Sequence, residues 1–174
     1  MRLYKILSIL LEYPSGELAE HWHDIEACID SLDHASDADK IALHAFIDWA
    51  KSLALLTLQA NYVKTFDQSP ENALYLTHHL FEEQDRERGP TLVELADYYK
   101  SQGFEIENNE LPDYLPLILE YVSTLDDETQ ARLFLKQSAE ACEIVAANLE
   151  SVHSPYASLV RMIERHGRLA ELAA

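Results

Sequence analysis

The sequence predicts an all-α protein, a single helical-bundle domain of roughly eight to ten helices. Apolar residues recur at helical spacing along most of the chain, whereas strand-like alternation appears only briefly near Phe104–Glu107. No Asn-Gly or Asp-Gly hairpin turn occurs. Because 174 residues suit one hydrophobic core, residues 1–174 are expected to form one domain.

The N-terminal part predicts helices separated by short turns. An apolar stripe through residues 3–11 stops at Pro14, and Ser15 can cap a second helix that runs to Ile29. Ser36 and Asp39 have the spacing of a capping box and predict the start of a third helix.

The middle part predicts three further helical segments. Thr57–Phe66 is the first of them. Ser69-Pro70-Glu71 has the composition of a helix start and predicts a helix through residues 73–81. Gly89-Pro90 is expected to break the chain before a helix that begins at Thr91 and that Gly103 ends.

The C-terminal part predicts long helices. Residues 111–125 form one apolar pattern, which Pro116 should kink or restart. Asp126 is expected to cap the longest helix, through Val152. Ser154-Pro155 begins the last helix, which is expected to end at Gly167.

Charge and cysteine usage restrict the partners and the compartment. The net charge is −18, and residues 61–120 carry half of it, which argues against nucleic acid and anionic membranes and favours basic partner surfaces. Cys28 and Cys142 are expected to be buried free thiols of a reducing compartment. Since no signal peptide and no apolar run of about 18 residues is apparent, we expect a cytoplasmic protein without direct membrane insertion.

Metal and nucleophile chemistry have little support. Glu20 with His23 and Glu150 with His153 have the Glu-x-x-His spacing of di-iron bundles, but about one such pair is expected by chance. His78 and His79 diverge by about 100° on a helix, which disfavours a shared metal. No G-x-S-x-G, HExxH or Cys/His zinc spacing occurs. We therefore assign no catalytic residue, metal or cofactor, and keep a His/Glu metal-dependent enzyme as an alternative.

Two segments, Asn61–Gly89 and Asn109–Tyr121, are unusually dense in polar and aromatic residues. From the residues alone, helix termini and a binding surface explain them equally well. Both segments resemble the NarJ family, the delta-subunit chaperones of respiratory nitrate reductase, within the TorD/DmsD-like redox-enzyme maturation chaperones. The resemblance runs from about Ile6 to Ile163 and rests on Leu10-Leu11-Glu12-Tyr13-Pro14, Tyr62, Phe66-Asp67, a histidine region, Arg86-x-Arg88-Gly89, Glu110-Leu-Pro-Asp113-x-Leu-Pro116 and Leu119-Glu120-Tyr121.

The resemblance implies a system-specific assembly chaperone and not an enzyme. Family members bind the apo catalytic alpha subunit of nitrate reductase in the cytoplasm, including its N-terminal peptide, a remnant of a twin-arginine-type signal. They support insertion of the molybdenum–bis(guanine dinucleotide) cofactor before membrane docking, and cofactor-biosynthesis proteins are further candidate partners. A generic helical adaptor with no maturation role is a further alternative, beside the metal-dependent enzyme of another class.

The resemblance, together with the acidic helical character, gives a site hypothesis. A client helix would lay its apolar face in a groove while carboxylates read its positive charge. For the aromatic candidates, core packing is the competing explanation. Arg86 and Arg88 could instead pair internally or meet an acidic client surface. The candidate client-binding residues are Tyr62, Phe66, Asp67, Leu76, His79, Arg86, Arg88, Asp113, Tyr114 and Glu120.

The sequence departs from the family pattern in two places. Tyr114 stands where the wider group often has histidine, so a role for imidazole protonation there is not expected. The polar C-terminal tail of many relatives has no counterpart before Ala174.

Overall fold

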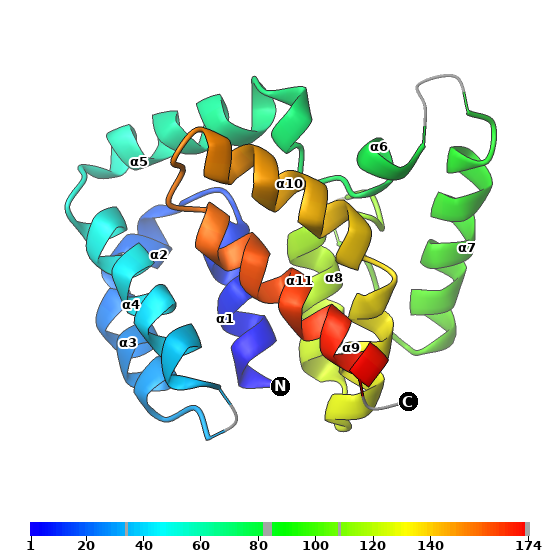
Figure 1. The fold of residues 1–174 in the computed structure, drawn as a ribbon, viewed down its shortest axis with the longest axis horizontal. Coiled ribbons are helices and arrows are strands. Elements are labelled where there is room, and N and C mark those ends of the chain that lie inside the picture. Colours follow the sequence, from blue (N-terminus) through cyan, green and yellow to red (C-terminus); the bar gives the residue numbers. More distant parts are fainter. Residues whose placement is uncertain (34, 82–84, 108, 173–174) are drawn as a thin grey trace.

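The structure is a computed structural model that describes residues 1–33, 35–81, 85–107 and 109–172, and the side chains among them as far as residue 169. Within these residues the chain is a bundle of α-helices, with one isolated β-bridge and no β-strand (Figure 1). The predicted all-α class is therefore confirmed. In chain order the elements are α1 (Arg2–Leu11), α2 (Gly16–Glu20), α3 (Trp22–Asp30), α4 (Asp37–Lys51), α5 (Leu55–Tyr62), the π-helix η1 (Val63–Asp67), the 3-10 turn η2 (Pro70–Asn72), α6 (Thr77–Leu80), α7 (Arg88–Ser101), α8 (Leu115–Thr124), α9 (Glu128–Lys136), α10 (Ala139–Ser151) and α11 (Ala157–Leu172).

Helix α8 lies at the centre of the bundle. Its residues Leu115–Leu119, Tyr121 and Val122 are buried, so this helix is apolar on nearly every face, as expected for a helix surrounded by protein. Helix α1 packs against α8, and α11 packs against both α9 and α10. Helix α7 stands at one edge of the bundle (Figure 1).

Local capping at two serines agrees with the sequence. Ser36 Oγ accepts a hydrogen bond from the Asp39 backbone N–H at 3.1 Å, and the Ser36 N–H donates to Asp39 Oδ2 at 3.3 Å, which completes the predicted capping box. Ser15 caps α2, as predicted. The predicted second helix is nevertheless two helices, since the chain turns at His21 between α2 and α3.

The helix predicted through residues 73–81 is wrong for its first half. Ser69-Pro70-Glu71 begins only the short turn η2, and helical structure returns at Thr77. In between, the Leu76 N–H donates to the Asp113 carbonyl at 3.1 Å, and the Leu115 N–H donates to the Leu74 carbonyl at 2.8 Å. These long-range hydrogen bonds replace the local bonds that a helix would form.

Two prolines lie in the first turns of helices, which contradicts the chain break expected at Gly89-Pro90 but agrees with a helical pattern that restarts at Pro116. Pro90 is the third residue of α7, so Gly89-Pro90 does not break the chain, and Pro116 is the second residue of α8. Proline is tolerated there because the first N–H groups of a helix have no partner within the helix. Gly103, at φ +74°, follows the end of α7 as predicted.

The predicted longest helix, through residues 126–152, is divided into α9 and α10. Asp127 and not Asp126 caps α9, through a 2.8 Å hydrogen bond from the Thr129 N–H, and the chain turns at Gln137-Ser138. Cys142 on α10 is buried, but Cys28 is exposed. The expectation for Cys28 is wrong. The buried face of α3 contains Ile29, and the side chain of Cys28 points about 100° away from it around the helix.

Gly167 lies inside α11 and does not end it. A Cβ at this position would lie 2.8 Å from the Leu135 carbonyl oxygen and 3.3 Å from the Ala139 Cβ. The missing side chain therefore allows α11 to cross the end of α9 at close range.

A buried polar network joins α1, α4 and α11. His166 Nδ1 lies 3.2 Å from the Tyr4 hydroxyl, and its Nε2 lies 3.4 Å from Asp39 Oδ2. Arg165 donates to Asp39 Oδ1 at 2.6 Å. Burial lowers the pKa of His166 from its ordinary value, although the Asp39 carboxylate opposes this shift.

Among the described residues, no single helix is long and apolar enough to cross a membrane. One pair, α4 with the segment Leu55–Asp67, meets the length and composition requirement together, but it is bent by 117°.

We predict that Gly167→Ala destabilises the fold by about 1–3 kcal/mol, because the added Cβ meets backbone atoms that cannot move alone. Chemical denaturation of the full chain measures this change. Gly16→Ala is the control, since open space surrounds Gly16 and its replacement should change stability by less than about 1 kcal/mol. Equal effects of the two substitutions would contradict the close crossing of α9 and α11.

The lowered pKa of His166 predicts a pH dependence. Between the folded pKa and the unfolded value of 6.5, the unfolded chain binds a proton that the folded chain excludes, so stability falls as the pH decreases. Denaturation from about pH 7.5 to about pH 5 should therefore show a slope that His166→Gln reduces. Asp39, whose pKa is lowered below 3.8, contributes only in more acidic solution. An unchanged slope in the variant would contradict this assignment.

Candidate functional site

The two segments singled out in the sequence meet in the fold. Tyr75 and Tyr114 form an antiparallel β-bridge, and their rings lie 5.2 Å apart. The Tyr75 hydroxyl donates to Glu110 Oε1 at 3.1 Å. Residues 82–84 of the first segment, and Asn108 just before the second, lie outside the described residues. The junction between residues 74–77 and 110–115 separates two cavities.

The first cavity is an apolar groove of about 600 Å³ between α6, α7, α8 and α9. Leu80, Tyr98 and Leu133 line it and keep 40%, 42% and 60% of their surface exposed. The ring of Phe134 stacks on Tyr98 with a centroid distance of 5.6 Å. Exposed apolar side chains around a groove are typical of a protein-binding surface. Below, we call this cavity the apolar groove.

A buried carboxylate lies on the wall of the apolar groove. Asp113 is 1% exposed, and its Oδ2 accepts hydrogen bonds from the Thr77 N–H at 3.0 Å and the Thr77 hydroxyl at 2.6 Å. Arg88 Nε donates to the same hydroxyl oxygen at 2.9 Å. Asp113 Oδ1 has no hydrogen-bond partner in the described part of the chain. Buried oxygens are normally satisfied, so this carboxylate oxygen is an exception within the described residues.

The second cavity, of about 510 Å³, lies on the other side of the junction and is acidic. Phe104, Tyr114 and Leu117 supply its apolar surface. Its carboxylates belong to Glu12, Glu105, Glu107, Glu110 and Glu120. Glu120 also forms an ion pair with Lys5. Below, we call this cavity the acidic pocket, and its charge favours cationic groups.

Tyr62 and Phe66 lie in the core and not on the surface. The Tyr62 hydroxyl donates to the Leu11 carbonyl at 3.0 Å and lies 3.0 Å from the Tyr114 hydroxyl, while the Phe66 ring packs against Tyr62 and Tyr156. Burial raises the pKa of Tyr62 far above its ordinary value. Phe66 packs against Tyr62, and Tyr62 contacts Tyr114, which lines the acidic pocket. Both residues therefore support the pocket from the core side.

The other candidate residues are divided between several places. Leu76 is buried but borders the apolar groove. Half-buried His79 has its Nε2 2.7 Å from the Ala73 carbonyl oxygen, and burial lowers its pKa. Arg88 Nε donates to the Thr77 hydroxyl, whereas the internal alternative for it named an aspartate or glutamate partner. Asp67 and Arg86 are exposed and border neither cavity.

Sequence reasoning missed the groove residues of α7 and α9. Tyr98 directly precedes buried Tyr99, and Leu133 lies two residues before buried Leu135. The signal available in the sequence was a large apolar residue close to the helix stripe that faces the core, because such a residue can form an exposed apolar surface.

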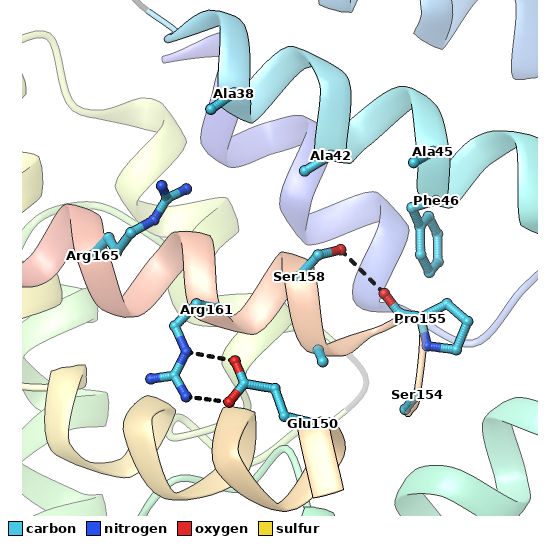
Figure 2. A pocket seen from close by; sticks show the side chains of 11 residues that line it. Ala38, Ala42, Ala45, Phe46, Glu150, Ser154, Pro155, Ser158, Arg161 and Arg165 are labelled. Carbon is cyan, nitrogen blue, oxygen red and sulfur yellow. Dashed lines mark hydrogen bonds and ion pairs between the residues drawn. The ribbon is translucent and has the colours of Figure 1, made fainter. Parts of the chain in front are cut away.

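A metal centre finds no geometric support in the described residues, since no three His, Cys, Asp or Glu side chains come together. Glu150, of one Glu-x-x-His pair, instead accepts hydrogen bonds from Arg161 at 2.9 and 2.8 Å (Figure 2).

Comparison with known proteins identifies the family of this chain. The family described as "Nitrate reductase delta subunit" matches residues 29–162. The chain is 33% identical over 158 residues to the "Nitrate reductase molybdenum cofactor assembly chaperone NarJ" of Escherichia coli K12, with 91% of this chain and 66% of the relative covered. It is 34% identical over 160 residues to the "Probable nitrate reductase molybdenum cofactor assembly chaperone NarJ" of Bacillus subtilis, covering 92% and 85%. The chain thus spans just under two thirds of the Escherichia coli relative's length. It belongs to the nitrate reductase delta subunit family, the NarJ family.

Proposed function

We propose that this protein is a cytoplasmic, non-catalytic chaperone that binds the apo catalytic alpha subunit of nitrate reductase. The observation that carries the proposal is the apolar groove beside the acidic pocket, in a chain whose relatives are named molybdenum cofactor assembly chaperones. The N-terminal peptide of the alpha subunit is the proposed handle.

The apolar groove suits the apolar face of an amphipathic helix. Leu80, Tyr98 and Leu133 offer exposed apolar surface on three different helices, so an inserted helix would be contacted from several sides. Asp113 borders the groove but is only 1% exposed, so the apolar contacts would supply most of the affinity.

The acidic pocket supplies the charge recognition. Glu105 and Glu107 line the pocket and are exposed to solvent. The whole chain has a net charge of −18. Carboxylates of this kind attract a basic peptide at long range and oppose binding of acidic segments. Since exposed charges are screened by salt, binding should weaken as the ionic strength rises.

By binding the apo subunit, the chaperone would act in its maturation. It would keep the subunit competent for molybdenum cofactor insertion before membrane docking. The cofactor belongs to the client in this scheme, and no residue of this chain is assigned to it. Cofactor-biosynthesis proteins are proposed as further partners at this stage.

Calorimetric titration with the N-terminal peptide of the cognate alpha subunit tests the proposal. Leu133→Ser should weaken binding about tenfold or more, because a buried leucine side chain contributes about 1.5–3 kcal/mol. Leu56→Ser is the matched control, because Leu56 on α5 is 77% exposed and borders neither cavity, so its affinity should stay unchanged.

The peptide result has three informative outcomes. Selective binding of the native peptide over a scrambled one, weakened by Leu133→Ser alone, supports the proposal. Equal affinities of the two leucine variants would remove the apolar groove from the site. Failure to bind either the peptide or the folded apo subunit would favour a generic helical adaptor.

The charge contribution has its own prediction. Glu105→Gln combined with Glu107→Gln should weaken peptide binding severalfold at low salt and flatten its salt dependence, because the acidic pocket loses two charges. Glu17→Gln combined with Glu20→Gln removes two exposed charges of α2 and should leave the salt dependence nearly unchanged. Identical effects of the two pairs would assign the attraction to net charge and not to the acidic pocket.

A further inference from the structure

A cavity of about 450 Å³ lies between the start of α4, α9 and the C-terminal part of α11, away from the junction of the two segments. Three of the chain's seven arginines border it, although the protein is strongly acidic. Its lining residues are Ser36, Asp39, Arg132, Arg165, His166, Arg168 and Leu169. Below, we call this cavity the arginine pocket.

Arg165 keeps hydrogen-bonding capacity that a neighbouring arginine has lost. Arg161, one turn before Arg165 on α11, gives its Nε and Nη2 to the two oxygens of Glu150, so its fork is occupied (Figure 2). Arg165 contacts Asp39 through Nη2 alone, extends toward the start of α4 (Figure 2), and its side chain is 49% exposed. An arginine with unused donors can still bind an oxyanion through two parallel hydrogen bonds.

Arg132 approaches the pocket from the opposite side, on α9. Its Nη2 pairs with Glu128 and its guanidinium also donates to the Tyr4 hydroxyl, but its buried Nε has no hydrogen-bond partner within the residues that the structure describes. A buried donor without an acceptor is costly, and an anion in the pocket would supply the acceptor.

The carboxylates near the pocket do not fill it. Asp39 is the one carboxylate among the described lining residues, and it is buried and bonded to Ser36, His166 and Arg165. Arg168 pairs with Glu143 and Glu164, which do not line the cavity. The lining thus combines three arginines with one carboxylate whose oxygens are already engaged.

We propose that the arginine pocket binds the phosphate group of a small molecule. Arg132 and Arg165 come from different helices and can hold one phosphate between them, and the cavity volume lies within the range of small-molecule sites. This site is separate from the apolar groove and does not depend on the proposed client. Arg132 is nevertheless the neighbour in sequence of the groove residue Leu133.

Titration of the full chain with pyrophosphate and with inorganic phosphate, at constant ionic strength, tests the proposal. We expect saturable binding of one pyrophosphate per chain, weakened about tenfold or more by Arg132→Gln and by Arg165→Gln. Lys100→Gln removes the same charge from an exposed position of α7 that borders none of these cavities, and should leave the affinity unchanged.

Because Arg165 also bonds to buried Asp39, thermal unfolding without anion identifies any variant that is simply destabilised. Arg165→Lys keeps the charge but not the fork, and should weaken pyrophosphate binding to an intermediate degree. Absence of saturable binding, an equal loss in Lys100→Gln, or tighter binding of citrate than of pyrophosphate would overturn the assignment.

Discussion

The pairing of residues 74–77 with residues 113–115 is the constraint on which the candidate site depends. Two backbone hydrogen bonds, from Leu76 to Asp113 and from Leu115 to Leu74, hold the segments together, and the Asp113 side chain caps the first N–H of α6 at Thr77. The same few residues therefore fix where α6 and α8 begin. Asp113 lies in a turn that is closed by a hydrogen bond from the Tyr114 N–H to the Leu111 carbonyl, and Tyr114 follows it as the N-cap of α8. One borders the apolar groove and the other the acidic pocket.

Behind this junction, aromatic packing makes the surface rigid. Tyr62, Phe66 and Tyr156 contact one another, and the Tyr62 hydroxyl links Leu11 to Tyr114. A chaperone that binds an exposed peptide benefits from such a scaffold, because a preformed groove loses less conformational freedom on binding. Tyr62 and Phe66, which belong to the family motifs, thus support the candidate binding surface from the core and do not form part of it.

Helix α9 lies between the apolar groove and the arginine pocket. Leu133 and Phe134 face the apolar groove, Arg132 borders the arginine pocket, and Leu135 faces Gly167 of α11 at backbone distance. Successive residues of this short helix border different features because its 3.6-residue period turns neighbouring side chains by about 100°. The close crossing at Gly167 and the His166–Asp39 contact hold α11 against this helix and against α4.

The sequence by itself determined the all-α class, the capping box at Ser36 and the Ser15 cap, because helix periodicity and caps are interactions between residues three or four positions apart, and its motifs indicated the family. Only the tertiary structure decided that residues 73–76 lie outside a helix, that Pro90 stands in a first turn, and that Gly167 lies at a helix crossing. It also decided that Tyr62 and Phe66 are buried while Tyr98 and Leu133 remain exposed. The physical reason is the same in each case: the partner that satisfies the backbone or covers the side chain lies tens of residues away along the chain, where local patterns carry no information about it.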